Sequence, residues 1–253
     1  MASAARPWYK RPLALIGVFI AALLVAWLGV FLWEVGHDAL LIKSGTLDPV
    51  AAIQSHAFSE SVDQAIATTD VTPDDIARIE NGSNPTLGNP NAKLHIVEFL
   101  DYGCPFCQQE APIIRAFMAK HMDDAYLVIR DFPLVDLHPT AMDDAISARC
   151  VFAQGNSSRY WIYYDRLYAS QDAQTPADLR GYAEQIGVDL AAYDACVAAK
   201  QPQDNITASQ QDGLAAGVRG TPTFFFNGIE IQGAIDAGSL EIVAQDVLKH
   251  AGN

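Results

Sequence analysis

The chain has 253 residues, half of them hydrophobic, and a formal net charge of −14 at pH 7. This length suits one folded domain with additional segments. The acidic balance argues against a nucleic-acid partner, because binding phosphates requires clustered positive charge. A solvated surface explains the acidity better than a specific docking site does.

Residues 12–33 contain no charged side chain. As a helix they would be roughly 33 Å long, enough to cross a hydrocarbon core of about 30 Å. Basic residues flank this segment on the N-terminal side, and Glu34 and Asp38 follow it. The positive-inside rule therefore places residues 1–11 in the cytoplasm and the rest of the chain outside. A cleaved signal peptide would have a shorter apolar region of about 7–15 residues, so an uncleaved single-pass anchor is predicted.

Residues 34–87 show no strand alternation and are predicted to form a helical spacer. Apolar residues at helical spacing predict an amphipathic helix over about residues 49–68. Threonine is a common N-cap residue and proline a common first residue of a helix. Thr72 and Pro73 therefore predict the start of a second, short helix, which ends at Asn81-Gly82. The apolar stripe is too short and irregular for a coiled coil. A spacer or packing element is favoured, and an oligomerisation stalk is the alternative.

Turn-forming residues at Asn84-Pro85 and over residues 88–91 predict the start of an α/β domain that covers residues 88–253. Its first part is a strand–helix–strand unit over residues 94–100, 105–121 and 125–130.

The second half of this domain begins with helices. Residues at helical spacing, separated into segments by glycine and proline, predict a helical block over about residues 138–216. It comprises residues 140–154, 160–169, 175–186, 190–200 and 203–216. A hairpin with a primed-turn signature follows over residues 223–226 and 229–232, and then a last helix over about residues 239–250.

Cys104 and Cys107 follow directly after the first strand of this domain, where the first helix begins at Pro105. Free backbone N–H groups and the positive end of the helix dipole stabilise an anion at that place, so Cys104 is expected to be rich in thiolate. A thiolate is the nucleophile of disulfide exchange. Cys107, one turn later, can form a disulfide with Cys104 or resolve a mixed one.

Two less specific interpretations of this pair are a zinc half-site and a structural disulfide. A second pair of metal ligands at suitable spacing is missing from the sequence, which argues against zinc. A bridge over two intervening residues gains little loop-closure entropy. A redox role is therefore favoured, and no metal or cofactor is predicted.

With these motifs the chain resembles the DsbA-like thiol–disulfide oxidoreductases of bacterial cell envelopes, and more loosely their membrane-anchored subgroup. The resemblance covers roughly residues 88–253. It rests on the Cys104-Pro105-Phe106-Cys107 stretch, on Glu98 six residues before Cys104, on residues 217–224, and on the inserted helices. It implies a thioredoxin fold with a helical insertion, preceded here by the predicted transmembrane helix.

The resemblance also implies roles for single residues. Pro222 would be a cis-proline facing the redox pair, and Thr221 would offer backbone groups to an extended substrate strand. The alternative is an ordinary trans proline at the start of a strand. Glu98 lies within the otherwise apolar residues 96–100, so its side chain is expected to be buried beneath the site, as in the family. Burial raises the pKa of a carboxyl group, which makes Glu98 a candidate to relay a proton to or from Cys107. An exposed carboxylate at a sheet edge is the alternative.

Cys150 and Cys196 lie on two predicted helices of the insertion, and similar pairs form structural disulfides in some members of the family. Two free buried thiols are the alternative, which an oxidising compartment disfavours. The strongly oxidising members have a histidine where this chain has Phe106. Because Phe106 brings no hydrogen-bond donor and no charge, a weaker oxidant or an isomerase stays open.

The sequence thus predicts a protein disulfide oxidase anchored in the bacterial inner membrane, with its catalytic domain in the periplasm. Its partners would be the thiols of exported proteins, and either a quinone-linked membrane oxidase or an electron-donating thiol protein. A disulfide isomerase or reductase of the same fold, and a tethered metal-binding chaperone that uses Cys104 and Cys107, are the alternatives.

Overall fold

A computed structural model of the protein describes residues 16, 20, 23, 26–33, 37, 72–81 and 84–250. The chain divides into two compact units, Met1–His56 and Ala57–Asn253. Residues 26–33 are helical. The rest of the predicted anchor is described only at residues 16, 20 and 23, and the helix predicted over residues 49–68 lies outside the described residues. A search of the described part of the chain finds no helix with the length and apolarity needed to cross a bilayer.

Among the described residues of the second unit, five strands form one sheet in the order β1-β3-β2-β4-β5. β2 and β3 are parallel, and the other neighbours are antiparallel. The strands are β1 (Thr86–Gly88), β2 (Leu94–Leu100), β3 (Ala125–Asp131), β4 (Thr223–Phe226) and β5 (Ile229–Gln232). Asn227 and Gly228 have positive φ angles of 49° and 90° and turn the β4–β5 hairpin, as their sequence signature predicts.

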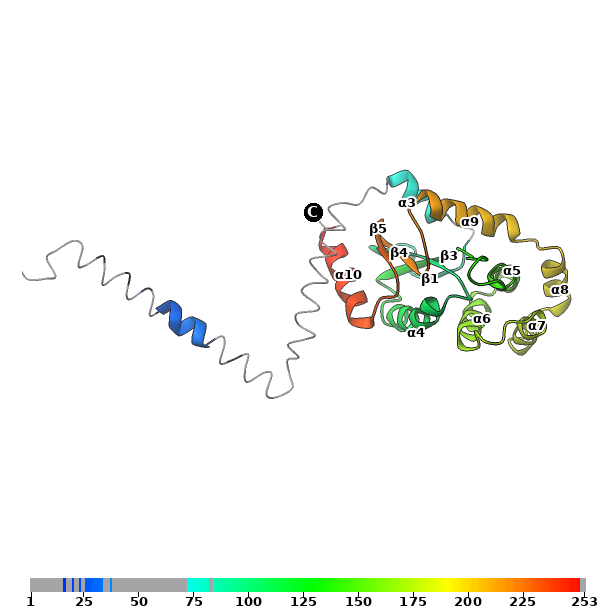
Figure 1. Ribbon diagram of the computed structural model, residues 1–253, viewed down its shortest axis with the longest axis horizontal. Coiled ribbons are helices and arrows are strands. Elements are labelled where there is room, and N and C mark those ends of the chain that lie inside the picture. Colours follow the sequence, from blue (N-terminus) through cyan, green and yellow to red (C-terminus); the bar gives the residue numbers. More distant parts are fainter. Residues whose placement is uncertain are drawn as a thin grey trace, which may run out of the picture. The chain divides into compact units, whose positions relative to one another are not determined.

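Helices cover both faces of this sheet (Figure 1). α4 (Pro105–Lys120) and α10 (Ala237–His250) contact each other and pack on one face, and α9 (Gln203–Ala215) packs on β3 from the other. Side chains of β2 alternate between two hydrophobic clusters, with Ile96 in the first and Val97 in the second. This strand is therefore buried on both sides, which fits its almost continuous apolar sequence.

Four further helices build the insertion beside the sheet, and their bounds agree with the predicted helical block to within a few residues. They are α5 (Ala141–Phe152), α6 (Ser157–Ala169), α7 (Pro176–Gln185) and α8 (Leu190–Ala198), and α9 completes the block. The prediction of an α/β thioredoxin fold with a helical insertion is confirmed.

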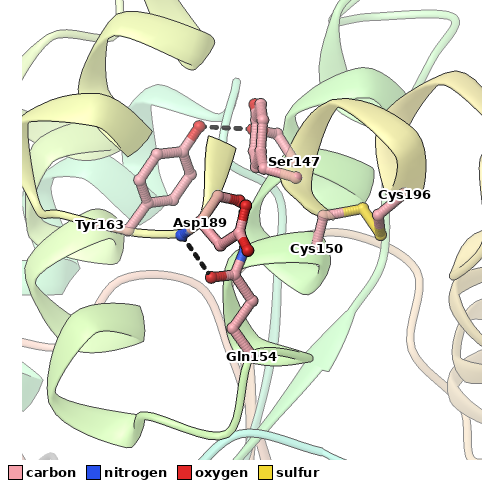
Figure 2. The surroundings of a disulfide bond; sticks show 7 residues. Ser147, Cys150, Gln154, Tyr163, Asp189 and Cys196 are labelled. Carbon is pink, nitrogen blue, oxygen red and sulfur yellow. Dashed lines mark hydrogen bonds between the residues drawn. A yellow bond between two sulfur atoms is a disulfide. The ribbon is translucent and has the colours of Figure 1, made fainter. Parts of the chain in front are cut away.

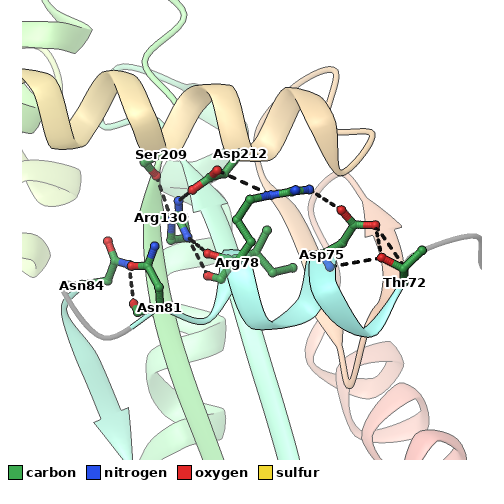
Figure 3. Close-up of polar contacts among 9 residues, drawn as sticks. Thr72, Asp75, Arg78, Asn81, Asn84, Arg130, Ser209 and Asp212 are labelled. Atoms are coloured by element: carbon green, nitrogen blue, oxygen red, sulfur yellow. Dashed lines mark hydrogen bonds and ion pairs between the residues drawn. The ribbon is translucent and has the colours of Figure 1, made fainter.

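The described end of the predicted spacer packs against the domain. α3 (Pro73–Ile79) begins with a capping box formed by Thr72 and Asp75, as predicted for the cap. At its other end the buried guanidinium of Arg130 donates to the carbonyl oxygens of Arg78 (2.9 Å) and Ile79 (2.8 Å) (Figure 3). These carbonyls have no partner within the helix, so the contact caps the C-terminus of α3.

Arg130 also binds α9, through Ser209 at 3.0 Å and Asp212 at 2.6 Å. α3 is thereby joined to both β3 and α9, and β1 pairs with β3 next to it. Structure that belongs to the domain therefore begins before residue 88, the predicted boundary. This contact has no signal in the sequence, because an arginine near the end of a strand does not indicate that it will hold a helix more than fifty residues upstream.

A disulfide joins Cys150 on α5 to Cys196 on α8, which confirms this predicted pair. Figure 2 shows a second link beside it, where the side-chain amide of Gln154 donates to the carbonyl of Asp189 and accepts from its N–H, at 3.0 Å and 2.8 Å. The buried hydroxyl of Ser147 also hydrogen-bonds to Tyr163 and Tyr193. Covalent and polar contacts thus fix α5 to α6 and α8.

Replacing both cysteines with alanine (C150A/C196A) is expected to lower the free energy of unfolding by about 4 kcal/mol, because the bridge closes a loop with a sequence separation of 46. Urea unfolding followed by circular dichroism measures this. The C104S/C107S protein is the control, since it keeps the Cys150–Cys196 bridge. A loss below about 1 kcal/mol would show that the bridge does not constrain the unfolded chain as this estimate assumes.

Candidate redox site

The two redox cysteines lie at the start of α4, shortly after the end of β2. Cys104 is the N-cap residue of α4, with extended backbone angles, and Cys107 lies in the first helical turn. Both are reduced thiols. Cys104 is 3% exposed and Cys107 is fully buried, whereas Phe106 between them is 58% exposed. Of the two sulfur-bearing side chains, only that of Cys104 keeps any exposed surface, and it lies next to the exposed ring of Phe106.

The loop before β4 faces Cys104 from the other half of the domain. The Thr221–Pro222 peptide bond is cis, as predicted. The thiol of Cys104 donates to the carbonyl oxygen of Thr221, with Sγ and O 3.2 Å apart. Parts of the chain 117 residues apart thus meet at the reactive sulfur. The predicted role of Thr221 in substrate binding stays a prediction.

The pKa of Cys104 is lowered to about 5, from an ordinary value of 9.0. The largest cause is a hydrogen bond with the thiol of Cys107. Thr221 and the backbone N–H groups of Cys107 and Phe106 lower this pKa further, against an opposing effect of burial. The backbone N–H groups at the helix N-terminus, which the sequence indicates, thus contribute less to the lowered pKa than the thiol of Cys107 does.

Cys107 is affected in the opposite direction. Burial raises the pKa of Cys107 well above its ordinary value, and the hydrogen bond to Cys104 and the negative charge there raise it further. The pair therefore consists of one thiolate and one thiol over a wide pH range. This asymmetry makes Cys104 the nucleophile and the better leaving group.

The loop that carries Cys104 is fixed by a buried carboxylate, Asp101. Its oxygens accept from the N–H groups of Gly103 and Leu134 and contact the ring Nδ1 of His138, all at 2.8 Å. A Cβ on Gly103 would lie 2.7 Å from the Cβ of His138, so only glycine allows this close approach. His138 thus packs against the redox loop and contacts the carboxylate that fixes it.

The insertion also holds the redox loop. The side-chain amide of Gln171, between α6 and α7, donates to the carbonyls of Tyr102 (2.8 Å) and Cys104 (2.9 Å). Gln108 on α4 donates in return to the carbonyl of Tyr168 at 2.7 Å. Sequence reasoning missed these contacts, because a glutamine in a loop carries no signal that names a partner 67 residues away.

Glu98 is fully buried, as predicted, and sits on β2 beneath the helix turn of Cys107. Neither carboxylate oxygen has a hydrogen-bond partner among the described residues. Burial raises the pKa of Glu98 well above its ordinary value, and repulsion from Glu110 adds to this. Glu98 also acts electrostatically on Cys107. A protonated acid is therefore held near the thiol that must gain or lose a proton.

Sequence reasoning missed a second buried acid, Glu110. It lies on α4 one turn after Cys107 and is fully buried. The helix register could have revealed it, because positions 107, 110, 111 and 114 form one stripe at helical spacing and the other three are apolar or thiol side chains.

No group of three or more His, Cys, Asp or Glu side chains in the described part of the chain is arranged to hold a metal ion. The metal-binding alternative thus rests on Cys104 and Cys107 alone.

Comparison with known families decides the relationship. Residues 80–245 match the family described as Thioredoxin. The chain belongs to this family. The chain thus combines membership of this family with a Cys-x-x-Cys pair that lies between a strand and a helix and faces a cis-proline. The family and the site both point to the enzyme class of thiol–disulfide oxidoreductases.

Solved structures of similar fold include the thiol-disulfide exchange protein α-DsbA2 from Wolbachia pipientis. It has a TM-score of 0.63 and 20% identity, and the match covers 76% of this chain and 98% of that one. BcfH from Salmonella enterica Typhimurium has a TM-score of 0.64 and 20% identity, over 90% of this chain and 99% of that one. At these identities the likeness establishes the fold, and it confirms the resemblance to DsbA-like proteins at that level.

Curated relatives with higher identity carry a different name. The Na(+)/H(+) antiporter NhaA 1 of Salinispora arenicola is 33% identical over 153 residues, which is 60% of this chain and 23% of the antiporter. NhaA 1 of Mycobacterium sp. strain KMS is 35% identical over 155 residues, 25% of its length. The chain therefore spans about a quarter of the length of the curated relatives it matches.

In the reduced protein, Cys104 is expected to ionise with a midpoint near pH 5, because its thiolate is stabilised by Cys107 and Thr221. Alkylation by iodoacetamide should be fast above that pH and be lost as the pH falls through it. The ultraviolet absorbance of the thiolate should follow the same curve. The C104S protein provides the baseline for both signals. A midpoint near 8.5, the value of an ordinary thiol, would contradict this assignment.

Proposed function

We propose that the protein is a thiol–disulfide oxidoreductase that introduces disulfides into exported proteins. The observation that carries this proposal is the asymmetry of the pair, in which Cys104 has a pKa of about 5 and keeps a small exposed surface, while Cys107 is fully buried and has a raised pKa.

The reaction starts from the Cys104–Cys107 disulfide. A substrate thiolate attacks Sγ of Cys104, the bond to Cys107 breaks, and Cys107 leaves with the electron pair and takes up a proton. A second substrate thiolate then attacks the substrate sulfur of the mixed disulfide. Cys104 leaves as a thiolate, so the substrate is oxidised by two electrons and the enzyme is reduced by two.

The low pKa of Cys104 favours this direction. A thiol of low pKa is a good leaving group, and stabilising the reduced form makes a pair more oxidising. The side chain of Phe106 has no donor to strengthen this effect, so the stabilisation comes from Cys107, Thr221 and the backbone N–H groups at the start of α4. Isomerase or reductase activity of the same site is the alternative.

A membrane-proximal, exported location forms part of the proposal. Residues 12–33 are uncharged over a length that suits a bilayer. The curated relatives that match about 60% of this chain are named as Na(+)/H(+) antiporters. The Cys150–Cys196 bridge fits an oxidising compartment. We place the domain in the periplasm, anchored in the inner membrane and reoxidised by a quinone-linked thiol oxidase.

The reduction potential of the Cys104–Cys107 pair separates the two directions. The oxidase proposal predicts a potential well above that of thioredoxin, which is about −270 mV, together with oxidative refolding of a reduced, unfolded substrate. The potential is measured by equilibration with glutathione buffers, with C104S as the inactive control. A potential near that of thioredoxin and no oxidase activity would reject the oxidase proposal and favour a reductase.

Trapping identifies the substrates. The C107A protein cannot resolve a mixed disulfide, so exported proteins should accumulate in disulfide linkage to Cys104 when this variant replaces the natural protein in cells. The complexes should disappear on reduction and should be absent from the C104S/C107A control. If exported cysteine-containing proteins are never captured, the proposed substrate class is wrong.

A further inference from the structure

Two buried carboxyl groups, Glu98 and Glu110, lie near Cys107 without compensating cations. Both are fully buried. Neither takes part in any ion pair found among the described residues. Both oxygens of Glu98 and Oε1 of Glu110 have no hydrogen-bond partner there. A buried carboxyl group in such surroundings is costly to ionise, so each is suited to hold a proton.

The second oxygen of Glu110 connects it to the surface. Oε2 accepts from the backbone N–H of Ile235 at 2.7 Å, in the turn before α10. Asp236, the next residue, is exposed. Glu110 therefore bridges the interior beside Cys107 and a solvent-facing turn.

The electrostatic contacts run in one order along this line. Glu98 acts on Cys107, Glu110 acts on Glu98, and Asp236 acts on Glu110. From the insertion, Tyr160, Tyr164 and Tyr168 on α6 also interact with Glu98. Besides Cys107, the titratable groups that interact with these two acids in the described part of the chain are thus one exposed aspartate and three buried phenols.

The chemistry of Cys107 requires such a path. Each turnover makes Cys107 leave as a thiolate and then become a thiol, but its side chain is fully buried. Glu98 can supply one proton, but it is fully buried as well and must be reprotonated before the next cycle. A route from Glu98 to solvent is needed.

We propose that Glu110 is the second group of a proton path that links Cys107, through Glu98, to solvent at the Ile235–Asp236 turn. This inference rests on the proposed function. Glu110 is a positioning and relay residue in this scheme, because it acts through Glu98 and forms no hydrogen bond with the sulfur of Cys104 or of Cys107 in the described part of the chain.

During reduction of the disulfide by a small dithiol, the thiolate of the dithiol attacks Sγ of Cys104. The Cys104–Cys107 bond breaks, and its electron pair stays on Cys107. Cys107 takes the proton of Glu98, Glu98 takes the proton of Glu110, and Glu110 takes one from solvent. The second thiolate then releases Cys104 and closes the oxidised dithiol, so protons and electrons balance without another reactant.

The test is the rate of reduction by dithiothreitol as a function of pH, in the full chain and in Glu110→Gln. Glutamine keeps an oxygen that accepts from Ile235 but cannot carry the proton. The pKa of Glu110 is raised to about 7, so the natural protein should show an inflection near pH 7 after correction for the ionisation of dithiothreitol. In E110Q this inflection should disappear and the rate should fall by about 10-fold, less than the 10²–10⁴-fold of a complete general-acid step.

Two further variants separate a relay from a structural effect. Asp144→Asn is the matched control, because Asp144 is another fully buried, unpartnered carboxyl group whose pKa is raised to about 7, but it lies on α5. D144N should keep the inflection. In Glu98→Gln the path is already broken, so adding E110Q should slow the reaction no further.

An unchanged pH profile in E110Q, or loss of the inflection in D144N as well, would overturn the role of Glu110. If E110Q does not fold, infrared difference spectra of the natural protein between its reduced and oxidised states decide the question. The relay predicts a change in a protonated carboxyl band beyond that of Glu98, and a single changing carboxyl group would refute it. A protein whose disulfide dithiothreitol cannot reduce at any pH would instead refute the proposed function.

Discussion

The hydrogen bond between the two thiols at the start of α4 is the interaction on which the chemistry of this protein depends. It is the largest cause of the lowered pKa of Cys104, and it adds to burial in raising the pKa of Cys107, so one contact acts on the two sulfurs in opposite directions. The contact exists because a helix begins at Pro105, which places the N-cap side chain and the side chain three residues later on the same side of the first turn. Burial then raises the pKa of the two thiols to different extents, because Cys107 faces the core whereas Cys104 faces the cis-proline loop.

Much of the remaining structure holds this turn in place. Asp101 and His138 fix the loop before it, Gln171 fixes its carbonyls from the insertion, and Thr221 faces its reactive sulfur. The Cys150–Cys196 bridge and the hydrogen bonds around Ser147 and Gln154 make the insertion rigid. The helical insertion is therefore part of the redox site, because it contributes contacts to the backbone of Cys104 itself.

The sequence predicted the features that depend on local chemistry. A nearly continuous apolar run located β2, and turn residues and helix caps located the β4–β5 hairpin and the helices of the insertion. The burial of Glu98 followed from its apolar neighbours. What it did not predict depends on contacts between distant residues. β1 is three residues long and is defined by its pairing with β3, and α3 is held by Arg130. Glu110 is the exception, since its place on the buried stripe of α4 was visible in the helix register.

The pH dependence of the Cys104–Cys107 reduction potential tests the central claim most directly. With two electrons transferred, each proton taken up on reduction changes the potential by about 30 mV per pH unit. Between pH 5.5 and 6.5, at the acid end of the range where Cys104 is a thiolate and Cys107 a thiol, one proton is taken up, so this account predicts a slope of about 30 mV per pH unit. A slope of about 59 mV per pH unit over that range would show that both sulfurs are protonated, and it would contradict the asymmetry on which the mechanism rests.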